Sequence, residues 1–528
     1  MRANDRGAAG AVGAGLLVVG TLVAAGGAAR AQESEPDGDR DVALTVYSSA
    51  DPRGFDPQQY VAQQQQGYNP WAAWQVPGFG VVKEVRRFAL PDGTGTLRIT
   101  DVAAFIDPTT VSFADLDAPD GTAVLDQSFQ FDLVSPEKLL ERYVDREIVV
   151  VERRREGTAE VETRTRGTVL SVNGGQVVLQ TPDGLRFLPA TSGDLRLPSL
   201  PEGLITRPTL VWNVSSEAAG TRRVRTTYQT AGLTWRSDYK LVLPKGAKSA
   251  DLAAWVTLLN MSGASYRDAR LKLIAGDVQR IQPPGMVVDM LEMDRGAELG
   301  AAQAGFEEKE FFEYHLYTLP RRVDVLEAST QQIALFPTAA GVTTRKVLVY
   351  FGAEELRHVR HGSGALTQRD LGSGTNTKVD VYVEFDNREA NRLGRPLPKG
   401  KLRVYQRDDA DGTLEFVGED LIDHTPRDET VRVKLGQAFD VVGERTQTDF
   451  RLESGRKEMR ETIRVQVRNH KDEAVDVIVR EPLHRWSTWE ILSPSDPFEK
   501  QDSRTIHFTV TVPPRGEKTV TYTARYTW

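Results

Sequence analysis

The sequence predicts an all-β protein made of several domains. Short segments with alternating apolar and polar residues recur along the chain, and clusters of Gly, Pro, Asn and Asp separate them. Only one short stretch, after Ser135, carries the signals of a helix. With 528 residues, the chain is longer than one hydrophobic core usually serves, so we expect several domains.

The fold is expected to be organised around residues 228–277, which read as three consecutive strands. In the middle strand, apolar residues occupy both faces. Val256 and Leu258 share one face with their alternate neighbours, while Trp255 and Leu259 line the other. We therefore expect both faces of this strand to be covered, as at the centre of a β-sandwich. No catalytic or ligand-binding signature lies in this stretch.

The N-terminal segment has the order of a secretory signal peptide. Arg2 and Arg6 precede an apolar run, which ends in Ala29-Arg30-Ala31 before a polar segment. We expect export to the periplasm or the cell exterior, with residues 1–31 removed after Ala31. An uncleaved membrane anchor is the alternative. No later segment resembles a membrane span, so the mature chain is expected to have none.

Charge and residue content exclude several classes of function. The net charge is −8, and removal of residues 1–31 makes the chain more acidic, which disfavours a nucleic-acid partner. The chain has no Cys, so disulfides and thiolate chemistry are excluded. Of the 7 His residues, only His358 and His361 are closely spaced, and without Cys they supply too few ligands for a zinc site, so we favour chance spacing. We expect neither a metal nor a cofactor.

The elements before residue 147 form an expected N-terminal β domain, residues 32–146. A first strand at 42–47 is followed by an insertion, residues 48–79, rich in Pro and Gln. Strands resume at Gly80. Near the end of the domain, Ser135-Pro136-Glu137 places a capping Ser, a Pro and an acidic residue at a helix start, which predicts one short helix.

Three further domains are expected after this helix. Residues 147–200 contain short strands and tight turns, which indicate a small β-barrel or a meander. Residues 201–436 are expected to form a central β-sandwich with mobile loops at 279–303 and 361–377, where the strand pattern fades. Residues 437–528 are expected to form an immunoglobulin-like β-sandwich, since short strands recur between turns.

The insertion carries four aromatic residues that are candidates for ligand stacking: Tyr60, Tyr68, Trp71 and Trp74. Exposed aromatic rings can stack on flat ligands such as sugars. They can equally cover an apolar sheet face of the protein itself. We favour the second interpretation, because clustered Trp residues are on average highly buried.

A second candidate cluster consists of Glu419, Asp420, Asp423 and His424. Carboxylates beside a His can act as an acid–base pair. The same side chains can instead bind backbone groups that lack partners in a loop. We favour the structural role and assign no catalytic residue.

Several motifs together carry a family resemblance. They are YQTAGLTWRSDYKLVL from Tyr228, WVTLLNMSG from Trp255, EYHLYTL from Glu313, NREANRLGRPLPKGKLRVYQRD from Asn387, VGEDLIDHTPRDE from Val417 and LGQAFDVVGER from Leu435. The chain resembles the bacterial domain-of-unknown-function family numbered 4139, which includes proteins called mucoidy-inhibitor-like. The resemblance implies an exported β-rich protein without an established enzymatic activity. The insertion at residues 48–79 departs from the family pattern.

These observations favour a non-enzymatic protein that binds or scaffolds at the cell envelope, and they leave catalysis undecided. The expected partner is an envelope protein or a glycan, and not a nucleic acid. The oligomeric state is not predicted. The alternative is a carbohydrate-binding or glycan-hydrolysing protein that uses the aromatic residues of 60–74 and the carboxylates near Asp420.

Overall fold

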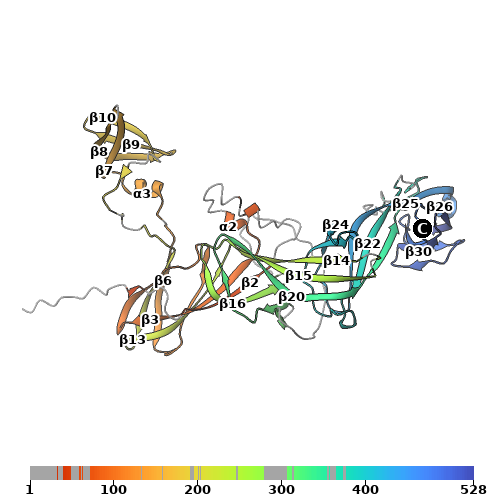
Figure 1. The fold of residues 1–528 in the computed structure, drawn as a ribbon, viewed down its shortest axis with the longest axis horizontal. Helices are drawn as coiled ribbons and strands as arrows, with labels where there is room; N and C mark the ends of the chain where they lie inside the picture. The colour runs from red at the N-terminus through yellow and green to blue at the C-terminus, as the bar shows by residue number, and fades with distance from the viewer. Residues whose placement is uncertain are drawn as a thin grey trace, which may run out of the picture.

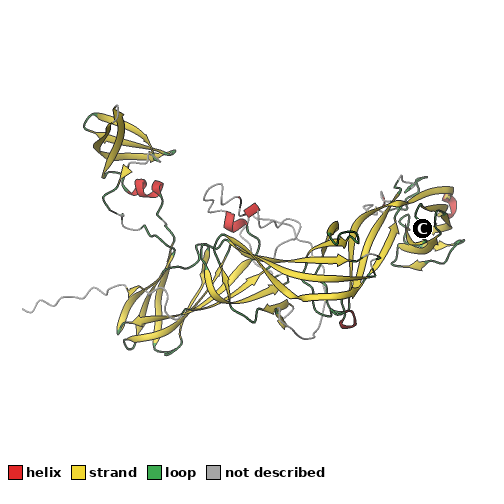
Figure 2. Ribbon diagram, in the orientation of Figure 1, coloured by secondary structure: helices red, strands yellow, loops and turns green. Residues whose placement is uncertain are grey.

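The computed structural model confirms the all-β class and shows an elongated molecule (Figures 1 and 2). The expected signal peptide (1–31), Tyr68, Trp71 and the loop 279–303 lie outside the described residues, and the loop 361–377 lies partly outside them. The structure describes residues 32–33, 40–48, 59–60, 62, 72–132, 134–156, 159–190, 195–199, 201, 204–244, 246, 248–276, 278, 306–311, 314–353, 356, 364–372 and 376–528.

Two large sheets form the main body of the molecule. The first sheet has the order β17 (Glu307–Phe311), β18 (Tyr314–Thr318), β16 (Tyr266–Ala275), β2 (Asp41–Tyr47), β3 (Phe79–Leu90), β13 (Gly220–Thr230) and β5 (Ile106–Asp115), with β19 (Val323–Val325) paired to β16. The second, five-stranded sheet has the order β20 (Ser329–Thr343), β15 (Ser249–Asn260), β14 (Leu233–Leu243), β23 (Gly400–Arg407) and β24 (Leu414–Ile422).

A third, four-stranded sheet lies toward the N-terminal end of the main body. Its order is β1 (Gln32–Glu33), β4 (Gly93–Ile99), β12 (Thr209–Ser216) and β6 (Thr122–Gln130). Trp212 of β12 is fully buried, and its ring packs edge-on against Phe113 of β5 at 5.2 Å between ring centroids. This contact joins the small sheet to the first large sheet.

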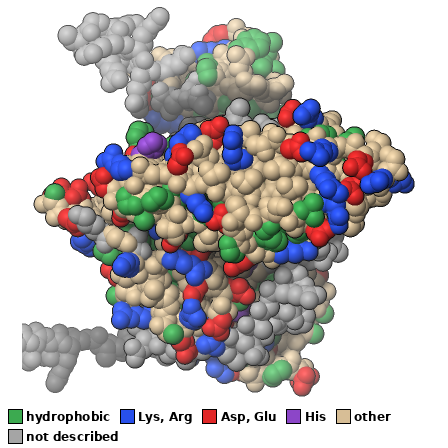
Figure 3. Space-filling view, turned by 90° about the vertical axis from the view of Figure 1, so that its right-hand side faces the viewer, with side chains coloured by type: hydrophobic (Ala, Val, Ile, Leu, Met, Phe, Trp, Pro, Cys, Tyr) green, Lys and Arg blue, Asp and Glu red, His purple; other side chains and the backbone are tan. Residues whose placement is uncertain are grey.

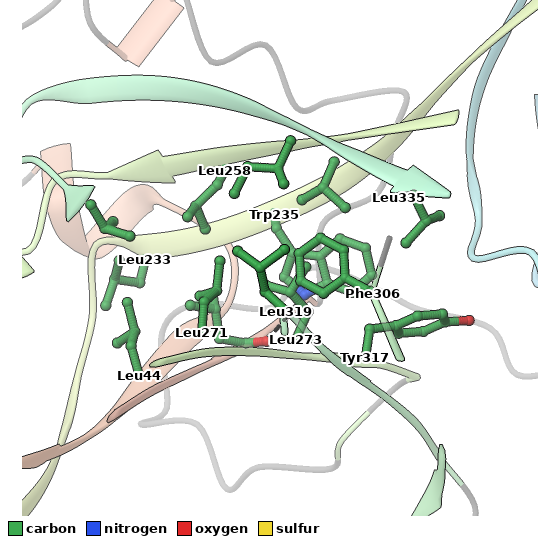
Figure 4. Packing of buried hydrophobic residues seen from close by; sticks show 14 of the residues in the cluster. Leu44, Leu233, Trp235, Leu258, Leu271, Leu273, Phe306, Tyr317, Leu319 and Leu335 are labelled. Atoms are coloured by element: carbon green, nitrogen blue, oxygen red, sulfur yellow. Dashed lines mark hydrogen bonds between the residues drawn. The ribbon is translucent and has the colours of Figure 1, made fainter. Parts of the chain in front are cut away.

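One continuous hydrophobic core extends through the three sheets, from Val42 onward, and into the strands that contain Phe385 and Val433, which belong to the C-terminal sheet described below. In Figure 4, Leu44 and Leu271 of the first sheet lie opposite Trp235 and Leu258 of the five-stranded sheet. Trp235 also donates a hydrogen bond from Nε1 to the carbonyl oxygen of Val46, at 3.1 Å. Each fully buried large apolar side chain contributes about 1.5–3 kcal/mol, so burial stabilises this disulfide-free body.

The predicted short helix is confirmed as α3 (Pro136–Arg142), and the Ser135 side chain accepts a hydrogen bond from the backbone N–H of Lys138 at 3.2 Å. It precedes a five-stranded meander that stands apart from the main body in Figure 1. The meander has the order β10 (Gly184–Pro189), β9 (Gln176–Thr181), β8 (Ala159–Asn173), β7 (Glu147–Glu156) and β11 (Leu195–Arg196).

The alternative of a small β-barrel for residues 147–200 is wrong. A barrel requires its first and last strands to pair. Within the described part of this region, β10 pairs with β9 and β11 pairs with β7, so the sheet stays open. β11 has only 2 residues, too few to continue the ladder around the sheet.

The C-terminal part of the chain forms a nine-stranded sheet. Its order is β28 (Trp489–Ile491), β31 (Glu517–Thr527), β26 (Glu458–Asn469), β25 (Thr430–Glu453), β22 (Lys378–Asp386), β21 (Arg345–Tyr350), β27 (Val475–Pro482), β30 (Thr505–Val512) and β29 (Glu499–Lys500). β25 has 24 residues and joins two cores, because Val433 lies in the main core and Val441 in a second core. Seen from this end, acidic and basic side chains are interspersed (Figure 3). An immunoglobulin-like topology remains a prediction.

The expectation that both faces of the central strand are covered is wrong for part of β15. Its inner face lies in the main core, as predicted. On the outer face, only the end near Leu259 is covered, where Val76 packs beside the short helix α2 (Ala72–Gln75) of the insertion. Trp255 is 41% exposed, because the described part of the insertion does not reach it.

No helix in the described ranges has the length and apolarity needed to cross a bilayer.

Candidate functional site

An open surface remains on the outer side of the five-stranded sheet, beyond the covered end of β15. Successive side chains of a strand point to opposite faces, so the residues between the core positions line this surface. We call it the open sheet face. Its members are Asp238, Lys240, Trp255, Lys401, Arg403, Tyr405, Phe416 and Glu419.

The strand register arranges these side chains in rows across the sheet. Asp238 of β14 lies between Trp255 of β15 and Lys401 of β23. In the next row, Arg403 of β23 lies between Lys240 and Glu419. Directly opposite residues on neighbouring strands have Cβ atoms about 4.5–5.5 Å apart, so side chains within a row are in mutual reach.

Arg403 lies between two carboxylates at the centre of the face. Its Nε lies 3.2 Å from Oε2 of Glu419, and its Nη1 lies 3.6 Å from Oδ1 of Asp238. Lys401 Nζ lies 3.6 Å from the other oxygen of Glu419. The guanidinium group has five N–H donors in a rigid plane, and these two contacts orient it on the face.

Asp238 is the buried member of this group, with 7% of its side chain exposed. Its Oδ2 accepts hydrogen bonds from Thr257 Oγ1 at 2.5 Å and from Arg236 Nε at 3.2 Å. Its buried Oδ1 has no hydrogen-bond partner among the residues that the structure describes. An unsatisfied buried polar atom costs about 1–3 kcal/mol, so the fold retains this carboxylate at a cost.

Aromatic side chains flank the charged centre on two sides. Trp255 lies beside Asp238, and Phe416 is 57% exposed on the edge strand β24. Phe416 packs edge-on against Tyr405 at 5.7 Å between ring centroids. The ammonium group of Lys240 lies 5.0 Å from the Tyr405 ring centroid, a cation–π contact. The face therefore combines flat apolar surfaces with hydrogen-bond donors and acceptors.

The structure separates the four residues of the predicted polar cluster. Glu419 belongs to the open sheet face, whereas the neighbouring Asp420 turns away from it. Asp420 accepts hydrogen bonds from the backbone N–H groups of Lys434 at 2.7 Å and Leu421 at 2.9 Å. Asp423 and His424 follow the end of β24 and are exposed.

His424 accepts a hydrogen bond at Nδ1 from the backbone N–H of Lys399, at 3.2 Å. Together with the contacts of Asp420, this hydrogen bond shows two members of the cluster binding the backbone. The structure does not bring the cluster together as an acid–base site.

The predicted stacking residues lie at the covered end of β15. Tyr60 packs with Val76 against the cluster that contains Leu259. Trp74 is 47% exposed and meets Phe105 edge-on at 6.1 Å between ring centroids. Tyr68 and Trp71 lie outside the described residues.

The two predicted sets are far apart along the sheet. Leu259 pairs with Thr234, whereas Glu419 lies in the row of Lys240. At roughly 3.3 Å per residue, these rows are about 20 Å apart along β14. The aromatic residues of the insertion and the carboxylates of β24 therefore do not form one site.

Sequence reasoning missed Asp238, Trp255 and Arg403. A usable signal was present in β14, where Arg236, Asp238 and Lys240 alternate with apolar residues. Such alternation predicts one buried and one accessible face. Because Trp255 pairs with Asp238, it shares that accessible face, but the pairing became known only from the structure.

A separate pocket of about 300 Å³ lies where β21 and β22 meet, and it is lined by Arg345, Glu384 and Arg388 among others. Its charges already pair with one another. Glu384 is bound by Arg345 and Arg432 on either side, and Arg388 binds Asp386. These contacts stabilise the sheet, and we place the candidate site on the open sheet face.

A protein-family model described as "Domain of unknown function (DUF4139)" matches residues 224–528. This range contains every residue of the open sheet face. The insertion and the meander lie before it. No curated protein matches the chain.

Proposed function

Because the chain belongs to the DUF4139 family, we propose that it is an exported, non-enzymatic binding protein of the cell envelope, with the open sheet face as its binding surface. The observation that carries the proposal is Arg403, which is held between two carboxylates and flanked by exposed aromatic rings. The order of charge, apolar run and small residues in 1–31 supports export.

The geometry favours binding over glycan hydrolysis. A glycosidase places two carboxylates on opposite sides of the scissile bond, roughly 5–10 Å apart across a cleft. Here Asp238 and Glu419 contact the same guanidinium group from one sheet face. They point the same way as their row neighbours, so a sugar would lie above both carboxylates and not between them.

The test is binding of the mature chain to an extract of its own cell envelope. Labelled wild-type protein is compared with Trp255→Ala and Arg403→Ala, and Arg451→Ala serves as the control. Arg451 is an exposed arginine that pairs with Asp449 on β25, away from the face. We expect the two face variants to bind at least about tenfold more weakly, which corresponds to about 1.4 kcal/mol. The control should bind like wild type.

Two results would contradict the proposal. If wild-type protein does not bind the extract, the chain is not an envelope-binding protein under these conditions. If all variants bind equally, binding occurs elsewhere on the molecule and the open sheet face has a different role.

A further inference from the structure

We propose that the open sheet face binds a saccharide chain that lies across the strands, from Trp255 on β15 to Phe416 on β24. This inference rests on the proposed function and names the chemical class of its ligand. It uses residues other than the aromatic side chains of the insertion, which lie at the covered end of the sheet.

The aromatic rings fit the apolar faces of sugar rings. Exposed Trp, Tyr and Phe rings offer flat contact area at low conformational cost. Trp255 and Phe416 lie on strands separated by β14 and β23, which amounts to three inter-strand steps. At about 4.8 Å per step, Trp255 and Phe416 are about 14 Å apart across the strands. Trp255 lies in the row of Lys401 and Phe416 in the row of Tyr405, four residues further along β23, which adds about 13 Å along the strands and makes the diagonal separation about 20 Å. A ligand that reaches both must be an extended chain and not a single sugar.

The charged centre fits the hydroxyl groups of such a chain. A sugar hydroxyl both donates and accepts hydrogen bonds. Between Trp255 and Phe416, the exposed carboxylate of Glu419 offers hydrogen-bond acceptors, and Arg403 and Lys401 offer donors. Mixed donors and acceptors suit a polyhydroxylated ligand better than a polyanion such as a nucleic acid, which the carboxylates would repel.

The insertion sets the direction of the bound chain. Tyr60 and Val76 cover β15 from Leu259 onward, so a ligand cannot continue along the strand past that point. Further along the same face Asp251 and Trp255 are exposed, whereas Thr257 beside Leu259 is buried. The accessible path therefore runs diagonally across the strands, from Trp255 over Arg403 to Phe416.

The test is calorimetric titration of the full mature chain with three soluble saccharides. The probes are a neutral glucan oligomer, an oligomer of N-acetylated amino sugars and, as a polyanionic control, a uronic acid polymer. We expect at least one of the two neutral oligomers to bind wild-type protein and the uronic acid polymer not to bind. Trp255→Ala and Phe416→Ala should each weaken that binding at least about tenfold, while Trp74→Ala, a matched exposed Trp off the face, should not.

Three outcomes would overturn the inference. If no saccharide binds while the envelope extract does, the proposed function stands and the ligand belongs to another class. If Trp74→Ala weakens binding and Trp255→Ala does not, sugars stack on the insertion. If Trp255→Phe, which keeps an aromatic ring, fails to retain binding better than Trp255→Ala, Trp255 does not act as a stacking platform.

Discussion

The open sheet face and the interior of the C-terminal sheet both pair arginines with carboxylates, but the pairs are accessible on the face and buried in the interior. In the interior, Arg445 Nε lies 2.9 Å from Glu481 Oε2, and Arg485 Nε lies 2.8 Å from Glu461 Oε2. All four side chains are at most 4% exposed. We call these four residues the closed network. On the open sheet face, Arg403 and Glu419 remain partly accessible.

Backbone and tyrosine contacts extend the closed network, although Glu481 Oε1 and Arg485 Nη2 have no hydrogen-bond partner among the described residues. Arg445 donates to the carbonyl oxygen of Gly372 at 2.6 Å, and Arg485 donates to that of Gln368 at 2.7 Å. The hydroxyl of Tyr522 donates to Glu481 at 2.5 Å. The segment 364–372 thus covers the closed network and accepts hydrogen bonds from both of its arginines. An arginine–carboxylate cluster is structural where the chain covers it and available to a ligand where the chain leaves it open.

Cationic partners also decide the charge state of buried carboxylates. Burial alone would raise the pKa of Glu84, but Arg86 and Arg40 outweigh burial and hold it below its usual value. Glu327 is held instead by backbone N–H groups, including that of Gly263 at 2.9 Å. Burial raises the pKa of Glu327 to about 7.

The largest expected effect distinguishes the closed network from the charged group of the open sheet face. Glu481→Ala leaves Arg445 charged and buried without its carboxylate, so we expect a loss of about 3–5 kcal/mol in the free energy of unfolding. Glu419→Ala removes the carboxylate partner of Arg403, which is partly accessible. The loss in the free energy of unfolding should be less than about 1 kcal/mol. Urea unfolding of both variants measures the difference. Equal losses would show that coverage does not distinguish the clusters.

A smaller effect concerns the half-buried carboxylate of Glu327, which is held by backbone donors. The pKa of Glu327 is raised in the folded state, so its contribution to stability is greatest below the unfolded pKa of about 4.5. It is lost as the pH rises to about 7, since the unfolded chain releases the proton first. We expect wild type to lose roughly 3 kcal/mol relative to Glu327→Gln over this range. Parallel pH-dependent curves for the two proteins would contradict this.

The last and smallest expected difference compares Trp255 with Trp235, and it tests whether the open sheet face is accessible in solution. Trp235→Ala removes a fully buried ring and should cost about 3–5 kcal/mol. Trp255→Ala removes a ring that is 41% exposed, and we expect a loss of only about 1–2 kcal/mol. Thermal or urea unfolding compares them. A cost at Trp255 as large as at Trp235 would mean that another part of the chain covers it.

Local sequence rules predicted the elements well, and they failed where distant segments meet. Ser135 and Pro136 marked the start of α3, and alternation marked the strands around Trp235. Adjacent carboxylates looked like one cluster in the sequence. Strand alternation places Glu419 on the accessible face and directs Asp420 toward the backbone of Lys434, so the two cannot act together.

The sequence by itself determined the all-β class, the family and which residues of β15 share a face, because alternation is a property of neighbouring residues. Only the tertiary structure decided which outer face is covered. Trp255 and Leu259 lie on the same side of one strand, yet Val76, far away in the chain, covers Leu259 and leaves Trp255 accessible. Coverage depends on where a distant segment packs, and no local pattern encodes that.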